Sequence, residues 1–436
     1  MKVGILGGGL SGLSLAYFLQ NYKEVESIDI IEKDNTFGGL CRSYPIRDGY
    51  FDIGPHILFS KNPQILEIIV DLLDSNVEKK KRNNKVCINQ KLSGYPIENY
   101  LGELDRNIAN YCLTTFLRNP YELNVPTNLL QAFLTTFGEG MTKFYFQPYN
   151  EKIWKYDPAF IDIKMMGRIP NPPVEDILRG AGGDYTEGFV HQLYFYYPKQ
   201  GGIASLINAL ISKLSDKVSG YGAYNIATII PSNKQWFVTS TTGKIEVYDV
   251  LISTIPLVDL THVMRTPIPK EVKHAVSRLR SNSHLSLAFA VMEDTLGDSL
   301  AITIPDKTTD IHRVTKLNTL TQWETNTLLA EITYTQGTTF DYMEDQQILN
   351  LASTQLIDLG FVPSIHSFLE GHLLRTPYAY VIYDLEHTKN MEIIRDFYEK
   401  KLGLFLRGRF GEHEYLNMDT VFERSQETAK QIVGEI

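Results

Sequence analysis

The sequence predicts an α/β fold in which a parallel sheet is combined with a helical insertion and an antiparallel sheet. Near the N-terminus a short apolar strand runs into a glycine-rich loop, a helix and a second strand, which is the order of a parallel β-α-β unit. Residues 100–180 have a mostly helical pattern, whereas residues 284–335 alternate as antiparallel strands do. The C-terminal residues return to strand, helix, strand and helix, so we expect them to rejoin the first sheet.

Length and composition indicate a globular protein of several packed units. The chain has 436 residues, of which 43% are hydrophobic and 21% are charged. Its formal net charge of −9 argues against a general nucleic-acid binder, and its one basic run, Lys79–Arg82, is interpreted as a solvated loop. Cys41, Cys87 and Cys112 have no disulfide or metal spacing, no signal pattern opens the chain, and no apolar run reaches the roughly 20 residues that span a bilayer. A cytoplasmic protein is therefore expected.

The first β-α-β unit contains a motif for phosphate binding. Val3–Leu6 is predicted as its first strand, Leu13–Asn21 as its helix and Ser27–Glu32 as its second strand. The loop after the first strand fits GxGxxG, whose glycines permit a tight turn, let a pyrophosphate approach the backbone, and let helix and strand pack closely. Glu32 ends the second strand, where a carboxylate can accept hydrogen bonds from ribose hydroxyls. The predicted dinucleotide-binding residues are Gly7, Gly9, Leu10, Ser11, Gly12 and Glu32.

A second glycine pair follows the acidic end of that strand. Glu32 is followed by Gly38-Gly39, a pattern that resembles the second glycine signature of flavoproteins of the amine oxidase and glutathione reductase superfamily. The resemblance implies FAD rather than NAD as the cofactor, and hence a Rossmann-like FAD-binding domain. Val250–Pro256 is similar to the stretch that re-enters this domain in those proteins. The resemblance adds Lys33, Gly38, Gly39, Leu40 and Arg42 to the cofactor-binding residues, with Arg42 able to meet the phosphates.

The other elements are predicted from periodicity and turn signals. Residues 34–60 are expected to be rich in loops. We expect helices at 63–74, 203–214, 389–402 and 418–433, strands at 85–96 (a pair), 235–239, 373–383 and 404–407, and a glycine loop at 408–411. The predicted division is an FAD-binding domain from residues 1–80, 203–280 and 386–436, a mostly helical substrate or cap region at 81–202, and an antiparallel-sheet substrate domain at 281–385.

Several further segments resemble UDP-galactopyranose mutase, in the order in which that family has them. Two departures stand out: Asn417 occupies the place of an aspartate, and Val381 that of a proline. The uridine-binding segment of the family is not recognised between 181 and 202, where Tyr194–Gly202 instead resembles the Tyr-Pro-x-Gly-Gly of the amine oxidase and protoporphyrinogen oxidase group. The similar segments are Gly54–Ser60, Gln147–Trp154, Arg168–Pro170, His312–Val314, Ala379–Ile382 and Gly408–Asp419.

The resemblance to the mutase implies chemistry without net redox. It implies that a nucleotide sugar passes between its pyranose and furanose forms, with N5 of reduced flavin as the nucleophile at the anomeric carbon. Such an isomerase would serve the biosynthesis of cell-surface polysaccharides, with no nucleic acid and no stable membrane insertion, and a homo-oligomer is left open. The alternative is an FAD-dependent oxidoreductase of the amine oxidase or protoporphyrinogen oxidase type. A flavin-bound scaffold that has lost catalysis is a third reading, which Asn417 keeps open.

The resemblance also implies roles for residues on the substrate side. Arginines suit a leaving pyrophosphate because their planar fork donates two charge-assisted hydrogen bonds. Arg168 and Arg313 are the candidates, with a surface ion pair as the alternative, which is as favoured as phosphate binding for Arg313. Tyr380 and Tyr415 would bind phosphate through their hydroxyls. Trp154 lines the cleft or is a structural core residue. A core role is the default for Tyr194, Tyr196 and Tyr197, with stacking on the base as the alternative for one of the three.

The remaining candidates lie beside the flavin. His56 can act as an acid or base near neutral pH, but we favour a reading in which its backbone faces the flavin, because the adjacent Gly54 and Pro55 shape a loop. Arg409, between the last strand and the last helix, is expected to face the FAD pyrophosphate. No metal site is predicted, because His413 and Glu414 have no ligand partner at a useful spacing. The residues assigned to the cofactor are therefore Gly54, Pro55, His56, Arg409 and Met418. His56 is assigned to catalysis as well, and so is Asn417.

Overall fold

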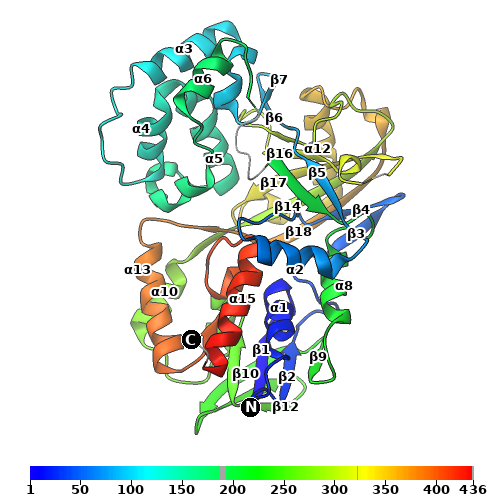
Figure 1. The fold of residues 1–436 in the computed structure, drawn as a ribbon, viewed down its shortest axis with the longest axis vertical. Helices are drawn as coiled ribbons and strands as arrows, with labels where there is room; N and C mark the ends of the chain where they lie inside the picture. Colours follow the sequence, from blue (N-terminus) through cyan, green and yellow to red (C-terminus); the bar gives the residue numbers. More distant parts are fainter. Residues whose placement is uncertain (187–192, 322, 435–436) are drawn as a thin grey trace.

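Figure 1 shows the computed structural model, which describes residues 1–186, 193–321 and 323–434. A parallel sheet with its covering helices forms the lower half of the view, and both ends of the chain lie there. The upper half holds a helical part on the left and an antiparallel sheet on the right. The molecule therefore has the α/β class that the sequence predicts.

Segments far apart in the sequence build the parallel sheet. Its order is β19-β13-β1-β2-β9, and each pair of neighbouring strands is parallel. Val3 and Ile5 of β1 face a core shared with four helices, whereas Leu6 faces the opposite core with Leu251 and Tyr398. The strands are β1 (Lys2–Leu6), β2 (Ser27–Ile31), β9 (Val218–Tyr221), β13 (Val250–Ser253) and β19 (Phe405–Leu406).

Each face of this sheet has its own cover. The four helices on the first face are α1 (Leu10–Leu19), α2 (Pro63–Leu73), α8 (Ala204–Ser212) and α15 (Met418–Val433). The second face is covered by a small antiparallel sheet and three helices. These are β10 (Ile226–Ser232), β11 (Gln235–Ser240), β12 (Ile245–Tyr248), α9 (Leu257–Val263), α10 (Lys270–Arg278) and α13 (His387–Arg395).

The seven-stranded sheet has the order β18-β14-β17-β16-β15-β6-β7 and is antiparallel except for the β15–β6 pair. Helix α12 (Asp345–Asp358) packs on it through Ile348, Ala352 and Leu356. The strands are β6 (Asn84–Ile88), β7 (Lys91–Gly94), β14 (Arg280–Val291), β15 (Ala301–Thr303), β16 (Arg313–Lys316), β17 (Asn326–Tyr334) and β18 (Phe368–Ile382).

The helical part packs against one end of this sheet. Phe137 stacks on Phe146 at 4.1 Å between ring centroids, and Ala379 and Tyr380 of β18 belong to the same core. The sheet and the helices therefore share an apolar boundary. The helices are the 3₁₀ segments Ile97–Glu103 and Ile163–Arg168, the π segment Thr142–Phe146, and α3 (Arg106–Leu117), α4 (Leu129–Met141), α5 (Gln147–Trp154) and α6 (Val174–Ala181).

The basic run is not the solvated loop that the sequence predicts. Glu78–Lys81 forms β5, which pairs antiparallel with β8 (Tyr194–Tyr197). The Lys79 ammonium lies 5.0 Å from the centroid of the Tyr194 ring across this pair. The local charge pattern could not reveal the strand, because its partner lies far along the chain and the pairing is set by tertiary structure.

Smaller differences concern loops and helix ends. The stretch expected to be loop-rich contains a hairpin of β3 (Ser43–Ile46) and β4 (Gly49–Asp52), and residues 408–411 form one helical turn, α14. The helix expected at 389–402 is α-helical only to Arg395 and continues as a π segment, Asp396–Lys401. Cys41, Cys87 and Cys112 are free and buried. No helix of the described chain is both long enough and apolar enough to cross a membrane.

Candidate cofactor and substrate site

The GxGxxG loop has no room for side chains at its turn. Gly7 has a φ of +102°, and a Cβ added to Gly12 would lie 2.0 Å from the Gly7 carbonyl oxygen. The Gly9 that precedes α1 provides no side-chain cap, and the first turn of α1 has no acidic residue. The first amide groups of α1, beginning at Leu10 and Ser11, are therefore available to an anion at the helix N-terminus.

The two glycine signatures are joined in space. The Gly38 amide donates to the Gly8 carbonyl at 2.8 Å, and Gly9 and Gly38 form a parallel bridge. A Cβ on Gly39, which has a φ of +57°, would come within 3.1 Å of the Gly9 Cα. The second signature thus closes directly over the first, which explains why both need glycine.

Glu32 is fixed between the two signatures. Its carboxylate accepts from the Gly8 amide at 2.8 Å and from the Asp34 amide at 3.0 Å, and the residue is buried. Arg42 is tied to the same loop by an ion pair to Asp34 at 2.8 Å, while its Nε is buried without a hydrogen-bond partner among the described residues. Lys33 is exposed. Open helix amides, a buried carboxylate at the end of β2 and the glycine contacts together fit the pyrophosphate and ribose of a dinucleotide.

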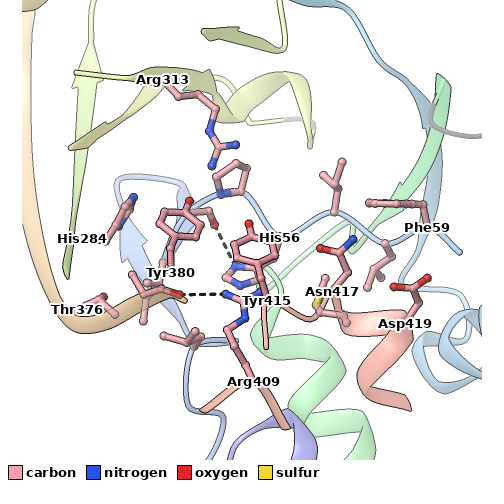
Figure 2. A pocket seen from close by; sticks show the side chains of 18 of the residues that line it. His56, Phe59, His284, Arg313, Thr376, Tyr380, Arg409, Tyr415, Asn417 and Asp419 are labelled. Carbon is pink, nitrogen blue, oxygen red and sulfur yellow. Dashed lines mark hydrogen bonds between the residues drawn. The ribbon is translucent and has the colours of Figure 1, made fainter. Parts of the chain in front are cut away.

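A cleft of about 830 Å³ brings most of the other candidates together. Figure 2 shows Arg313 entering from above and Arg409 from below, with Tyr380 and Tyr415 between them. The lining comes from the loop at 53–59, from β14, β16 and β18, and from the segment around α14 and the start of α15. Candidates that line it are Leu40, Gly54, Pro55, His56, Arg313, Tyr380, Arg409, Tyr415, Asn417 and Met418.

The Gly54–His56 loop forms one wall of this cleft. Gly54 has a φ of +75°, and a Cβ there would lie 3.3 Å from a carboxylate oxygen of Glu331. The His56 Nδ1 lies 3.1 Å from the Gly54 carbonyl oxygen. Burial, and after it the charge of Arg409, lowers the pKa of His56 to about 4. The imidazole is therefore neutral between pH 5 and 8, so its ring does not titrate near neutral pH as one reading of the sequence supposed.

Arg313 is held by a carboxylate that sequence reasoning missed. Its guanidinium makes a bidentate ion pair with Glu331, with one contact at 2.7 Å. Glu331 is fully buried and also lies 3.1 Å from Nε2 of His284. Burial opposes ionisation, but Arg313 and then His284 hold the pKa of Glu331 well below its ordinary value. The sequence carried a signal for this carboxylate, because Glu331 is the one acidic residue in the apolar run Leu328–Ile332 and a buried charge needs a partner.

Behind this pair lies a second histidine. His312 is fully buried, and neither of its ring nitrogens has a hydrogen-bond partner among the described residues. Its ring stands edge-on to His284, with centroids 6.0 Å apart. His284, His312 and Glu331 each offer an atom of metal-ligand type within 4.8 Å of the others. Glu331 already neutralises Arg313 there, so the cluster is accounted for as a support of that arginine.

Tyr380 and Tyr415 form a stacked pair, with ring centroids 5.4 Å apart and planes 15° from parallel. The guanidinium of Arg168 lies 3.5 Å from the Tyr415 ring centroid and that of Arg409 lies 4.6 Å from it. Arg409 also donates to the Leu416 carbonyl at 2.6 Å. Stacked phenols flanked by two guanidinium groups make a wall rich in hydrogen-bond donors.

Four predicted substrate residues do not line the cleft, and one of them is Arg168, which lies on the Tyr415 ring. Trp154 is buried behind the tyrosine pair, edge-on to Tyr380 and Tyr415, and its Nε1 donates to Asn150 at 2.8 Å. Tyr194 and Tyr196 belong to β8, and neither lines the cleft. The backbone of Tyr196 nevertheless borders the cleft, because it exchanges hydrogen bonds of 2.7 and 2.9 Å with Leu58, which lines it. Stacking of either ring on a base stays a prediction.

Asn417 and an unpredicted carboxylate, Asp419, line the cleft at the start of α15. Asn417 is the N-cap residue of α15, but its side chain makes no capping hydrogen bond. One carboxylate oxygen of Asp419 is buried without a partner among the described residues. Figure 2 shows both side chains on the same flank of the cleft. Both amide and carboxylate are therefore available to a bound group.

Comparisons with known proteins agree with this architecture. Residues 5–72 match the NAD(P)-binding Rossmann-like domain family. The chain is 24% identical to coproporphyrinogen III oxidase of Staphylococcus aureus over 286 residues, which span 58% of this chain and 60% of that protein. It is 23% identical to an L-amino-acid oxidase of Crotalus adamanteus over 309 residues, 65% of this chain and 56% of that one. The chain thus spans less than two thirds of the length of these relatives.

Solved structures match the chain over its full length. Reduced UDP-galactopyranose mutase superposes with a TM-score of 0.90 at 21% identity, covering 100% of this chain and 94% of that one. A fatty acid isomerase from P. acnes superposes with a TM-score of 0.68 at 13% identity, covering 98% of each chain. The fold is that of the FAD-dependent amine oxidase superfamily, to which the mutase-like resemblance of the sequence pointed, and the matches point to a flavin cofactor.

Proposed function

We propose that the protein is an FAD-dependent mutase that interconverts the pyranose and furanose forms of a nucleotide sugar. One observation carries the proposal: the cleft beside the Gly54–His56 loop is lined by Arg313 and Arg409 around the stacked hydroxyl-bearing rings of Tyr380 and Tyr415. Guanidinium and phenol donors converging on one space suit a pyrophosphate, whose oxygens accept several charge-assisted hydrogen bonds. An oxidase of apolar or amine substrates has no need of such a set, whereas an oxidase of a carboxylate substrate would use part of it, and the assay below therefore includes such substrates.

The cofactor that fits this chain is FAD. The glycine loop and the N-terminus of α1 would hold its pyrophosphate, Glu32 its ribose, and the Gly54–His56 loop would border its flavin ring. Reduced flavin supplies a nucleophile for the anomeric carbon when it is bound. The remaining requirements, which are to bind the nucleotide, orient the sugar and exclude water, fall on the side chains of the cleft.

The arginines would serve the leaving pyrophosphate in different ways. Arg313 is already oriented by Glu331, so it loses little side-chain entropy when it donates its remaining N–H groups to a phosphate. Arg409, which the sequence assigned to the FAD pyrophosphate, lines the cleft with Arg313 and would serve the substrate instead; it is likewise fixed by the Leu416 carbonyl. Arg168 lies on the Tyr415 ring and is largely exposed, so it would contact the outer part of the nucleotide.

The tyrosine pair would donate rather than accept. Burial and the adjacent Tyr415 raise the pKa of Tyr380, so its hydroxyl keeps its proton at neutral pH. Trp154 packs edge-on against both rings and limits their movement. The neutral His56 adds no charge that would compete for the pyrophosphate. The cleft would thus present fixed donors to a developing negative charge.

The alternative is an FAD-dependent oxidoreductase, which the sequence relatives favour, since both described above are oxidases. One assay distinguishes the two. The flavin-loaded protein is reduced with dithionite and incubated with UDP-galactofuranose and a panel of other nucleotide sugars, with oxidised protein as the control. We expect a ring-isomerised product that forms only with reduced flavin. Absence of turnover across the panel, together with peroxide formation from an amine, amino acid or porphyrinogen, would overturn the mutase proposal.

A further inference from the structure

A second cavity of about 620 Å³ lies beside the cleft and has no part in the mechanism above. It is bounded by the residues that join β5 to β6 and by the turn that follows β7. Its described lining is Arg82, Asn83, Asn84, Lys85, Gly94, Tyr95, Pro96, Tyr100, Pro170 and Leu193.

Arg82 stands where this cavity meets the cleft. Its guanidinium carbon lies 5.1 Å from the ring centroid of Phe59, and Phe59 lines the cleft while Arg82 lines the cavity. The Arg82 amide donates to the Leu193 carbonyl at 2.8 Å, which fixes the backbone. A ligand bound in the cleft can therefore extend past Phe59 to this guanidinium.

The Arg82 side chain has no anionic partner in the described parts of the chain. Its Nε is buried and makes no hydrogen bond there, and no described carboxylate lies within ion-pair distance. Arg313 differs in this respect, because Glu331 takes two of its donors. A partly buried guanidinium that packs on Phe59 but has no anionic partner among the described residues is costly, and its fork is suited to an oxyanion.

The described lining does not supply the missing charge. Lys85 is a second cation there and no acidic side chain belongs to the described lining, while the nearby Glu103 carboxylate accepts from the Gly94 amide at 2.7 Å. Glu98 is buried nearby, but burial raises its pKa to about 8, so it is mostly uncharged at neutral pH. The Asn84 Oδ1 is also buried without a described partner. Burial lowers the pKa of Arg82, and the charge of Arg313 lowers it further. Within the described lining, Arg82 and Lys85 thus have no carboxylate partner.

We propose that this cavity is an oxyanion subsite in which Arg82 binds an anionic group of the substrate. The inference rests on the proposed function only in taking a nucleotide sugar as the ligand. The group is either a carboxylate on the sugar, as in a uronic acid, or a phosphate of the nucleotide. Both present two oxygens that match the planar fork of arginine. No bond is made or broken by Arg82, which acts on affinity and on the choice of substrate.

Binding measurements on the flavin-loaded protein test this proposal without turnover. Dissociation constants are measured by calorimetry for UDP, UDP-galactose and UDP-galacturonate, with the natural protein, with Arg82→Met and with Arg82→Lys. Arg118→Met is the matched control, because Arg118 is exposed at the end of α3, outside both cavities. Flavin content and melting temperature verify that each variant folds.

The two sources of the anion give different results. If the anion is a sugar carboxylate, the natural protein binds UDP-galacturonate about tenfold or more tightly than UDP-galactose, and Arg82→Met abolishes that preference. If the anion is a phosphate, Arg82→Met weakens UDP itself by about tenfold or more, and Arg82→Lys restores part of the loss. Unchanged affinities in Arg82→Met, or no binding of any of the three ligands, would overturn the subsite. A protein that binds these ligands but never isomerises a sugar would instead overturn the mutase proposal alone.

Discussion

The phosphate-binding loop and the substrate cleft are built in opposite ways. The loop is made almost entirely of backbone within residues 7–42, and its key contacts join Gly38 to Gly8 and Glu32 to the Gly8 amide. The cleft is made of side chains that come from residues as far apart as His56, Arg313 and Arg409. A backbone site depends on the absence of Cβ atoms, whereas a side-chain site depends on which groups the fold brings together. We therefore expect abrupt loss of function in the first region and graded loss in the second.

Gly12→Val should produce the largest effect. A Cβ at Gly12 would lie 2.0 Å from the Gly7 carbonyl oxygen, and backbone cannot move aside as a flexible side chain can. We expect flavin affinity to fall by about a hundredfold or more, which corresponds to roughly 3 kcal/mol. Flavin absorbance of the purified protein measures the loss. Gly182→Ala is the control, because its nearest contact is an ordinary 3.4 Å. Normal flavin content in Gly12→Val would refute the backbone account of this loop.

Glu331→Ala should give the largest effect on the cleft side. It would leave the Arg313 guanidinium without its buried partner, and breaking such a pair by removing one member costs about 3–5 kcal/mol. The free energy of unfolding in urea measures this cost. Glu331→Gln keeps the shape and one acceptor, so its loss should be smaller. Because the glycine loop lies in another part of the fold, Glu331→Ala should retain its flavin under native conditions, and equal flavin loss in both alanine and glutamine variants would contradict the separation of the two regions.

The sequence predicted the first region more completely than the second because the first is local. Strand, glycine spacing and acidic residue follow one another along the chain, so β1, α1, β2 and Glu32 were predicted close to their observed bounds. The second glycine signature was identified by resemblance, but its contact with the first, the hydrogen bond from Gly38 to Gly8, was not predicted. In the cleft, by contrast, Arg313 was predicted but its partner Glu331 was not, because the two strands meet only in the folded sheet.

The same contrast between local and long-range structure explains why the basic run was wrongly predicted as a loop. Its partner is the strand of Tyr194 and Tyr196, which lies far along the chain. Stacking of these tyrosines on a base stays a prediction. Neither segment carries its partner within its own sequence, so no local pattern could have predicted the pairing. For Trp154 the sequence left two roles open, lining the cleft or packing in the core. Its burial and its hydrogen bond to Asn150 favour the core role.

The burial of Glu98, on the substrate side of the molecule, can be tested through the pH dependence of the free energy of unfolding. Burial raises the pKa of Glu98 to about 8, whereas an unfolded glutamate titrates near about 4.3. Between these values the folded state holds one more proton than the unfolded state, so the free energy of unfolding falls as pH rises, by at most about 1.4 kcal/mol per unit. This stability is fully present below the unfolded pKa and is lost as pH rises through 8. Urea unfolding from pH 5 to 9 measures the slope.

Glu98→Gln provides the control for that slope. The amide has the same shape and cannot ionise, so stability in this variant should vary less with pH above 5 than in the natural protein. Flavin affinity should change little, because Glu98 lies in the helical part and not in the glycine loop. An identical pH profile in both proteins would mean that Glu98 is already ionised in the folded state, contrary to its burial at 1% exposure.

Arg168→Ala should give the smallest effect and shows how graded the cleft is. Arg168 is largely exposed, stacks on the Tyr415 ring and donates only to the Tyr415 carbonyl at 3.2 Å, so stability should change little. If it contacts the nucleotide phosphates, kcat/KM for a nucleotide sugar should fall by about tenfold, since a hydrogen bond to a charged group contributes about 1.5–3 kcal/mol and part of it is lost to solvent here. Arg168→Lys should recover part of that loss through charge alone. Steady-state kinetics with reduced enzyme measure both variants, and an Arg168→Ala enzyme as active as the natural one would confine phosphate binding to the arginines that line the interior of the cleft.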